Sequence, residues 1–211
     1  RMMREYVALL RECFSGDSVS FEGDYFSTKR FRLGLRLEGK EPKIIMAALN
    51  PQMLKLGGEI ADGVLLNYLP ASHVKYSVNK VREGGDAKIF AYVHASVSDF
   101  EKAKTSARKD LFNYAMADGY AKMFKEAGFE DEITELREKQ KNKDREGALS
   151  AISDKMIQAI DFIGTTAEVK DFVDSYAEAG VEHPILMPMP WGENREKVAL
   201  ETMQAVFSSS V

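Results

Sequence analysis

Residues 42–67, PKIIMAALNPQMLKLGGEIADGVLLN, contain two apolar strands separated by a short helix. The predicted elements are a strand at Lys43–Ala48, a helix at Gln52–Ile60 and a strand at Val64–Asn67. Nearly continuous apolar strands are typical of parallel sheets that are covered on both faces. A strand that runs directly into a helix N-terminus leaves backbone N–H groups free to hold an anion, so this segment also predicts a phosphate-binding turn.

The chain after this segment repeats the alternation of strand and helix. We expect a helix at Ala71–Glu83, a third strand at Lys88–Val97, and last strands at Ile160–Ile163 and Pro184–Pro188. A capping box of Thr165 with Glu168 marks the helix between those last two strands. This order predicts an α/β fold with right-handed crossovers.

We expect one domain over residues 1–211, in four parts. A helix and loop lead-in (1–41) precedes parallel strand and helix units (42–98), a polar helical insertion (99–159), and the last strands with a closing helix (160–211). Within the lead-in, residues 18–26 predict a short hairpin or an extended excursion, and residues 27–41 predict a basic surface loop. That loop is either a solvated connector or a cover for an anionic ligand. The chain opens within a helical pattern without an N-cap, so we expect it to begin part-way through a longer protein.

Composition narrows the functional classes. A net charge of −4 and a pI near 5.6 argue against a nucleic-acid surface. No run approaches the roughly 20 apolar residues that a membrane-spanning helix needs. Cys13 is the one cysteine, which we expect to be small and buried, and the three histidines lack the spacing of metal ligands, so we predict no metal site. This cysteine usage suits a reducing cytoplasm, which is the predicted location.

At this point the motifs match a known pattern. Residues 47–51 (AALNP) and 56–63 (LGGEIADG) resemble the "AA-x-G-P … LAGEIADG" pattern of the luciferase-like monooxygenase superfamily, which includes bacterial luciferase and deazaflavin-dependent reductases. Residues 164–169 (GTTAEV) with 179–181 (AGV), and 21–26 (FEGDYF), are similar to further motifs of that superfamily. The resemblance implies a (β/α)8 TIM barrel with a helical insertion. Such barrels typically have about 250 residues, so we expect only the C-terminal part of one here.

The resemblance also implies a cofactor site. In the family, the backbone after this strand holds the phosphate of a flavin or deazaflavin, and the matching positions are Ala48, Leu49, Asn50, Gln52 and Met53. Many members have glycine where this chain has Leu49 and Asn50, so the backbone of this chain departs from the family pattern at these two positions. The alternative is a turn that only packs the barrel.

Other candidate residues follow the strands. Asn67 matches a position that contacts substrate in sugar-phosphate-oxidising relatives, or it satisfies loop backbone; Tyr68 either stacks on a ring system or roofs the barrel. We expect His94 to be a buried core histidine and Asp62 to brace the turn before Val64. After the last strand, Trp191, Glu193 and Arg195 either line the mouth of the barrel or pack on its surface.

The resemblance favours an oxidoreductase that transfers a hydride between coenzyme F-420 and a small organic substrate, in the branch of methylenetetrahydromethanopterin reductase. An FMN-dependent luciferase-like monooxygenase is the alternative within the superfamily, and a truncated, non-catalytic flavin-binding or interaction protein is the alternative outside it. The catalytic acid and base stay unassigned, because the family carries them on strands expected to precede this chain. We expect the chain to form a homodimer or to depend on that N-terminal half.

Overall fold

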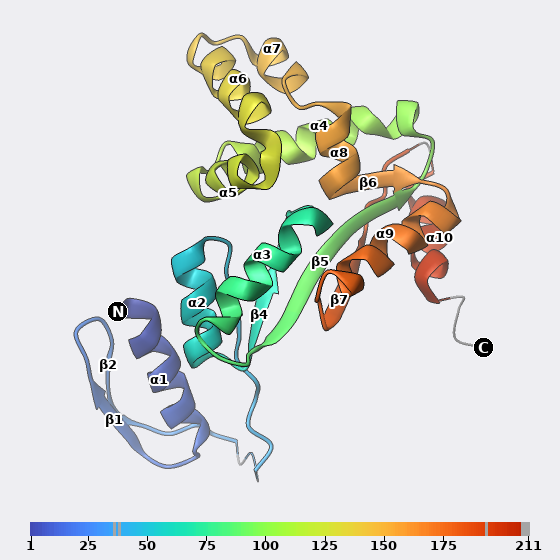
Figure 1. The fold of residues 1–211 in the computed structure, drawn as a ribbon. Coiled ribbons are helices and arrows are strands. Elements are labelled where there is room, and N and C mark those ends of the chain that lie inside the picture. Colours follow the sequence, from blue (N-terminus) through green and yellow to red (C-terminus); the bar gives the residue numbers. More distant parts are fainter. Residues whose placement is uncertain (36, 38, 193, 208–211) are drawn as a thin grey trace.

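A five-stranded parallel sheet forms the centre of the molecule, with helices packed against it (Figure 1). The computed structural model describes residues 1–35, 37, 39–192 and 194–207. The strands of the sheet are β3 (Ile45–Ala47), β4 (Gly63–Leu66), β5 (Lys88–Val97), β6 (Asp161–Gly164) and β7 (His183–Pro188). All the predicted parallel strands are therefore present, and their parallel pairing confirms the α/β prediction.

Strand β5 joins the other strands. It pairs with β4 along Lys88–Ala91, with β7 along Phe90–Ala95 and with β6 along His94–Val97. Its length of 10 residues is what allows one strand to contact three others. Strand β3 pairs with β4 from Ile45 to Ala47, and so lies at one edge.

The two faces of the sheet differ in exposure. On one face Val64, Ile89, Ala91 and Val93 are fully buried, because α2 (Pro51–Ile60), α3 (Ala71–Arg82) and α9 (Thr166–Glu178) cover the strands there. On the other face several apolar side chains are exposed to solvent: Ile45 is 46%, Ile185 36% and Met187 37% exposed. In a closed barrel this second face would be the interior.

Three glycines let α2 and the end of α3 touch through their backbones. A Cβ atom at Gly58 would lie 2.1 Å from the carbonyl oxygen of Val81, and one at Gly84 would lie 2.0 Å from that of Lys55. A Cβ at Gly85 would lie 2.4 Å from the carbonyl oxygen of Gly58. The close approach explains physically why the LGGEIADG segment carries glycine within a helix, where glycine is otherwise unfavourable.

The lead-in consists of α1 (Met2–Phe14) and an antiparallel hairpin, β1 (Val19–Glu22) with β2 (Ser27–Phe31). A hairpin is present, but its second strand lies at residues 27–31, beyond the predicted range of 18–26, so the predicted loop over 27–41 was wrong for these five residues. The carboxylate of Glu5 accepts hydrogen bonds from the backbone N–H groups of residues 24–26, which ties α1 to the hairpin turn. Cys13 is only partly buried, so the prediction of a buried cysteine was too strong.

Between β5 and β6 the chain is helical, as predicted for the insertion. Its elements are α4 (Phe100–Ala115), α5 (Asp118–Phe124), the π-helix η1 (Lys125–Phe129), α6 (Glu130–Lys141), α7 (Arg145–Ser150) and α8 (Asp154–Ile160). In Figure 1 these helices extend beyond one end of the sheet. The Thr165–Glu168 capping box is present at α9, and the last helix is α10 (Arg195–Phe207).

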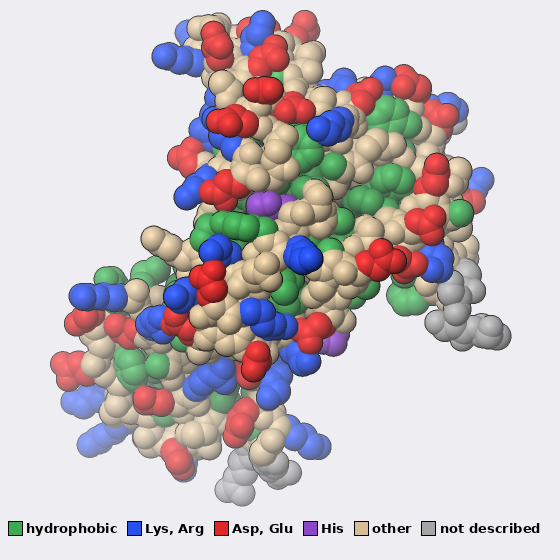
Figure 2. All heavy atoms as spheres, in the orientation of Figure 1, with side chains coloured by type: hydrophobic (Ala, Val, Ile, Leu, Met, Phe, Trp, Pro, Cys, Tyr) green, Lys and Arg blue, Asp and Glu red, His purple; other side chains and the backbone are tan. Residues whose placement is uncertain are grey.

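Charges of both signs are mixed on the face of the molecule that Figure 2 shows. Figure 2 shows lysine and arginine interspersed with aspartate and glutamate over the coloured part of the face in view. Among the described residues, no helix is both long and apolar enough to cross a bilayer.

Candidate functional site

The turn between β3 and α2 has the geometry of an anion site. Asn50 precedes the helix in an extended conformation (φ −103°, ψ 155°), its side chain makes no capping bond, and Pro51 occupies the first helical position. The N–H groups of Gln52 and Met53 lie in the first turn, where a helix offers no internal partner. The helix ladder begins with Leu54, whose N–H donates to the Asn50 carbonyl oxygen at 2.9 Å.

One of the predicted phosphate contacts is committed elsewhere. The N–H of Ala48 donates to the carbonyl oxygen of Leu65 at 3.2 Å, as part of the sheet. The backbone groups that remain to meet a phosphate are those of Leu49, Asn50, Gln52 and Met53.

Helix α5 lies over this turn. A Cβ atom at Gly119 would be 3.6 Å from Nδ2 of Asn50, and the other amide atom of Asn50, Oδ1, is buried without a hydrogen-bond partner in the described part of the chain. Buried polar atoms are nearly always paired, so this acceptor indicates a ligand or water that supplies a donor. A cofactor with both phosphate and hydroxyl groups matches this set of free N–H donors and an orphaned acceptor.

Asp62 braces the turn before β4 through hydrogen bonds of its carboxylate, as predicted. Its Oδ2 accepts from the N–H of Ile44 at 2.8 Å and from Arg11 at 3.3 Å. Partial burial acts to raise the pKa of Asp62, but the Ile44 hydrogen bond and the charges of Arg11 and Lys43 outweigh it and lower the pKa. Asp62 is therefore an ionised structural group.

Asn67 follows β4 and faces the insertion. Its Nδ2 donates to the hydroxyl of Tyr120 on α5 at 3.1 Å, while its Oδ1 is buried and has no hydrogen-bond partner among the residues that the structure describes. Two amide oxygens, of Asn50 and Asn67, are thus orphaned at the carboxyl ends of neighbouring strands. The carboxyl ends of parallel strands are where α/β folds build ligand sites.

Tyr68 is enclosed by other aromatic rings. Its ring stacks on His94 with a centroid separation of 4.0 Å and on Tyr114 with 3.7 Å. Two stacked neighbours this close must occupy opposite faces of the ring, and Tyr68 is only 4% exposed. In this conformation Tyr68 roofs the sheet, and no face is left to stack on a cofactor.

The backbone of Tyr68 adopts φ +50°, a conformation that aromatic residues rarely take. Its hydroxyl donates to Oδ2 of Asp110 on α4 at 2.7 Å. Burial, followed by hydrogen bonding to Tyr114 and Asp110, raises the pKa of Tyr68 well above its usual range. Burial likewise raises the pKa of Asp110. The phenol therefore stays protonated and acts as a donor to Asp110.

His94 is a buried histidine, as predicted, with 3% exposure. Burial lowers its pKa to about 4, so the imidazole is neutral near pH 7. Its neighbour Asp161, and also Asp110, Tyr114 and Tyr120, were not predicted as site residues from the sequence. A sequence pattern could have identified Asp161: it is an acidic residue inside an apolar run, residues 156–163 (MIQAIDFI), and such a position predicts a buried carboxyl group.

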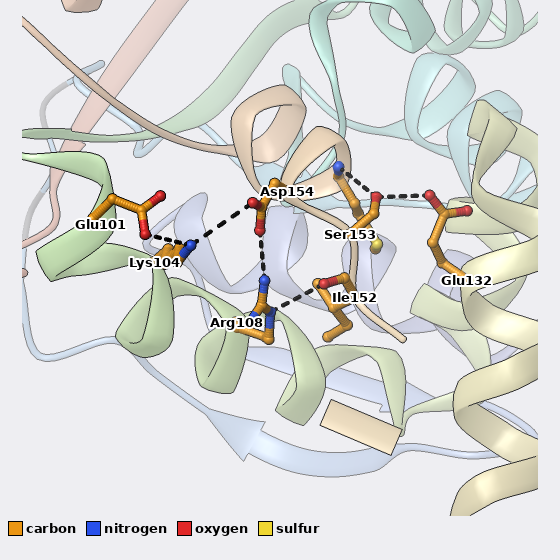
Figure 3. A network of polar contacts seen from close by, with 8 residues as sticks. Glu101, Lys104, Arg108, Glu132, Ile152, Ser153 and Asp154 are labelled. Carbon is orange, nitrogen blue, oxygen red and sulfur yellow. Dashed lines mark hydrogen bonds and ion pairs between the residues drawn. The ribbon is translucent and has the colours of Figure 1, made fainter. Parts of the chain in front are cut away.

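Salt bridges fix the helix that carries Asp110 and Tyr114 (Figure 3). Arg108 of α4 donates to Asp154 Oδ1 at 2.5 Å and to the carbonyl oxygen of Ile152 at 3.1 Å. Lys104, one turn earlier, lies 4.0 Å from Asp154 Oδ2. Because α8 begins at Asp154 and ends where β6 starts, this network holds α4 against the segment that leads to Asp161.

A groove of about 410 Å³ lies beside this cluster, between α4 and the connection from β7 to α10. Asp110 and Lys109 line one wall, and Trp191 and Arg195 line the other. Both Trp191 and Arg195 thus border a hollow near the end of the last strand, while Glu193 lies outside the described residues. Among those residues, no three His, Cys, Asp or Glu side chains are arranged to hold a metal ion.

The chain is similar in sequence and in structure to methanopterin reductases. The chain is 30% identical over 214 positions to 5,10-methylenetetrahydromethanopterin reductase of Archaeoglobus fulgidus, covering 93% of this chain and 62% of the reductase. The structure of the coenzyme F-420-dependent tetrahydromethanopterin reductase of Methanopyrus kandleri superposes with a TM-score of 0.73 at 24% identity, covering 95% of this chain and 60% of that one.

A further solved structure has the same fold. An F-420-dependent secondary alcohol dehydrogenase, solved with an F-420–acetone adduct, superposes with a TM-score of 0.60 at 21% identity, covering 88% of this chain and 55% of that one. The chain spans less than two thirds of the length of these three proteins. The sequence model of the luciferase-like monooxygenases matches residues 1–183. This chain belongs to the luciferase-like monooxygenase family.

Proposed function

We propose that this chain is the cofactor-phosphate-binding part of an oxidoreductase that transfers a hydride between coenzyme F-420 and a small organic substrate. The observation that carries the proposal is the β3–α2 turn, with free N–H groups and the orphaned Oδ1 of Asn50 at the carboxyl end of the sheet. The named F-420-dependent proteins among its relatives favour the deazaflavin over FMN. An FMN-dependent monooxygenase is the second candidate, because the family model that matches the chain is described as luciferase-like monooxygenase.

In this proposal the protein binds, orients and excludes water, and the bound deazaflavin supplies the hydride chemistry. The N–H groups of Leu49, Asn50, Gln52 and Met53 hold the phosphate at the positive end of α2. The orphaned oxygens of Asn50 and Asn67 accept hydrogen bonds from hydroxyl or N–H groups of the ligand. Tyr68 serves the site as a wall that keeps water out rather than as a stacking platform.

The partly open face of the sheet bears on partners. Ile45, Ile185 and Met187 form an exposed apolar surface, which soluble proteins normally bury. We propose that further barrel strands of the same polypeptide cover it, and that the reaction takes place in the complete barrel. Size-exclusion chromatography of the 211-residue chain, combined with a dye that binds exposed apolar surface, tests this proposal. A compact monomer that binds no such dye would contradict it, and a stable dimer would favour a second copy of the chain as the cover.

We propose the cytoplasm as the location, since the single cysteine suits a reducing compartment.

The substitution Asn50→Asp tests the phosphate turn. Aspartate caps helices as well as asparagine does, but its charge would repel a phosphate at contact distance, so we expect at least a roughly tenfold weaker F-420 affinity with no loss of folding. The control is Asn79→Asp, which adds the same charge on the exposed face of α3.

Fluorescence titration with F-420 and with FMN, at two salt concentrations, gives the measurement. If N50D and N79D bind F-420 equally well, the turn does not hold the phosphate. If the wild-type chain binds FMN but not F-420, the monooxygenase reading replaces the reductase reading. Binding of neither cofactor, by folded protein, would contradict both.

A further inference from the structure

Asp161 is a carboxylic acid in an environment with few partners. It is the first residue of β6 and is fully buried, and neither of its side-chain oxygens has a hydrogen-bond partner among the described residues. An ionised carboxylate in such a place would be very unfavourable, because nothing replaces the water it gave up. The carboxyl therefore needs either a neutral state or a partner close by.

The polar side chain that the sheet places beside Asp161 is that of His94. Asp161 pairs in register with His94 across β5 and β6, and its Oδ1 lies 3.9 Å from Nδ1 of the imidazole. This distance is longer than the 2.7–3.2 Å of a hydrogen bond, so a bond between the two groups requires their side chains to rotate toward each other. No cationic group is among the described titratable side chains around the pair. These side chains are Tyr68 after β4, Asp110 and Tyr114 on α4, Tyr120 on α5, and Tyr176 on α9.

The buried environment without cations determines whether Asp161 and His94 form an ionic pair or a neutral pair. Burial raises the pKa of Asp161 well above its usual range, and the nearby Asp110 adds to the effect. Burial lowers the pKa of His94 to about 4. Both shifts favour a neutral carboxyl beside a neutral imidazole, and in that state the carboxyl has one O–H to donate while Nδ1 is free to accept.

We propose that Asp161 is a positioning residue: its carboxyl O–H donates to Nδ1 of His94, which fixes the imidazole against the ring of Tyr68. The bond leaves the histidine proton on Nε2 and holds the stacked ring in one orientation. Tyr68 is in turn held with its hydroxyl toward Asp110, at the end of the sheet where the proposed cofactor site lies. The inference rests on the proposed function only for the use of that site; the hydrogen bond itself does not.

The tautomer of His94 is the direct test, and it needs no cofactor. In ¹⁵N NMR spectra of the imidazole rings, with His94→Gln used to assign the signal, we expect one protonated nitrogen, Nε2, and one hydrogen-bonded acceptor, Nδ1, from pH 5 to pH 8. Signals of an imidazolium at pH 7 would mean an ionic pair and would overturn the proposal. A mixture of the two neutral tautomers would overturn it as well.

Two variants separate positioning from packing. Asp161→Asn keeps a donor, its amide N–H, and should preserve the Nε2–H tautomer. Asp161→Leu fills similar space without a donor and should give a mixture of tautomers. If both variants behave alike, the carboxyl O–H is not what orients His94. Should D161L fail to fold by circular dichroism, the wild-type spectrum and D161N still decide the question.

Failure here and failure of the proposed function are distinguishable. A neutral, fixed His94 with no F-420 affinity would support the positioning role and contradict the cofactor. F-420 binding with an imidazolium at His94 would do the reverse.

Discussion

The hydroxyl of Tyr68 donates a hydrogen bond of 2.7 Å to Oδ2 of Asp110, joining the end of β4 to the first helix of the insertion. It connects residues 42 positions apart in a half-buried environment. The bond also explains how an aromatic residue is held at φ +50°, since α4 fixes the far end of the side chain.

Replacing Tyr68 with phenylalanine should lower the free energy of unfolding by about 1–2 kcal/mol, because Asp110 loses its donor while staying half-buried. The pKa of Asp110, which the tyrosine holds down, should rise further. Urea denaturation of Y68F measures the first effect. Tyr76→Phe serves as the control, since Tyr76 is 39% exposed, and equal losses in the two variants would contradict the role of the bond.

Glycine 58 should tolerate no side chain. In Gly58→Ala the new Cβ would meet the carbonyl oxygen of Val81 at 2.1 Å, so α2 and α3 must separate. We expect a loss of stability of roughly 2–4 kcal/mol, in the range seen for overpacked sites. Gly34→Ala, where nothing lies within 4 Å of the new Cβ, should change the melting temperature little. Similar melting temperatures for the two variants would show that the helices adjust freely.

Arg108→Lys should loosen the insertion. Lysine keeps the charge but loses the fork that reaches both Asp154 and the carbonyl of Ile152, so we expect a loss of about 1 kcal/mol. Arg145→Lys, at an exposed position on α7, is the matched control. Faster amide exchange in α4 and α8 of R108K alone would confirm the effect, and unchanged exchange would exclude it.

The pH dependence of stability should separate His94 from Asp161. Between about pH 4 and 6.5 the unfolded chain protonates His94 but the folded chain does not, so this residue makes stability fall as pH falls, by up to about 3 kcal/mol. Asp161 acts in the opposite sense. Its pKa is raised in the folded state, so its contribution is present below about pH 4 and is lost as pH rises.

In the wild-type chain these two slopes oppose each other. His94→Gln should therefore become less stable relative to wild type as pH rises through this range, and Asp161→Asn should become more stable. His73, whose pKa burial also lowers, is common to all three proteins. Carboxylates with lowered pKa values, such as Asp62, act mainly below this range. Parallel stability curves for the three proteins would contradict both assignments.

The backbone of the site was predictable from sequence, and its side-chain cluster was not. The β3–α2 turn follows from local rules: an apolar strand, then Pro51 at the first helical position, then a glycine-containing helix. The commitment of the Ala48 N–H to Leu65 depends on which strand lies beside β3, and no local pattern encodes that pairing.

The position of Tyr68 shows the same division. Its position at the end of a strand could be predicted from the sequence. The rings that stack on it could not, because His94 lies on β5 and Tyr114 on α4, 26 and 46 residues later in the chain. Asp110 looked like one more polar residue of a charged helix, since its role depends on the tilt of α4 toward the sheet. Long-range contacts of this kind require the fold before they can be assigned.

The way β5 is shared among its neighbours also has a consequence for local opening of the chain. Because β4, β6 and β7 all pair with this one strand, none of the three can leave the sheet without exposing part of it. The amides of β5 between Phe90 and Ala95 should therefore exchange with solvent only on global unfolding, while those of the β1–β2 hairpin exchange through small fluctuations. The strand that carries His94 is thus the last part of the molecule to give up its protection.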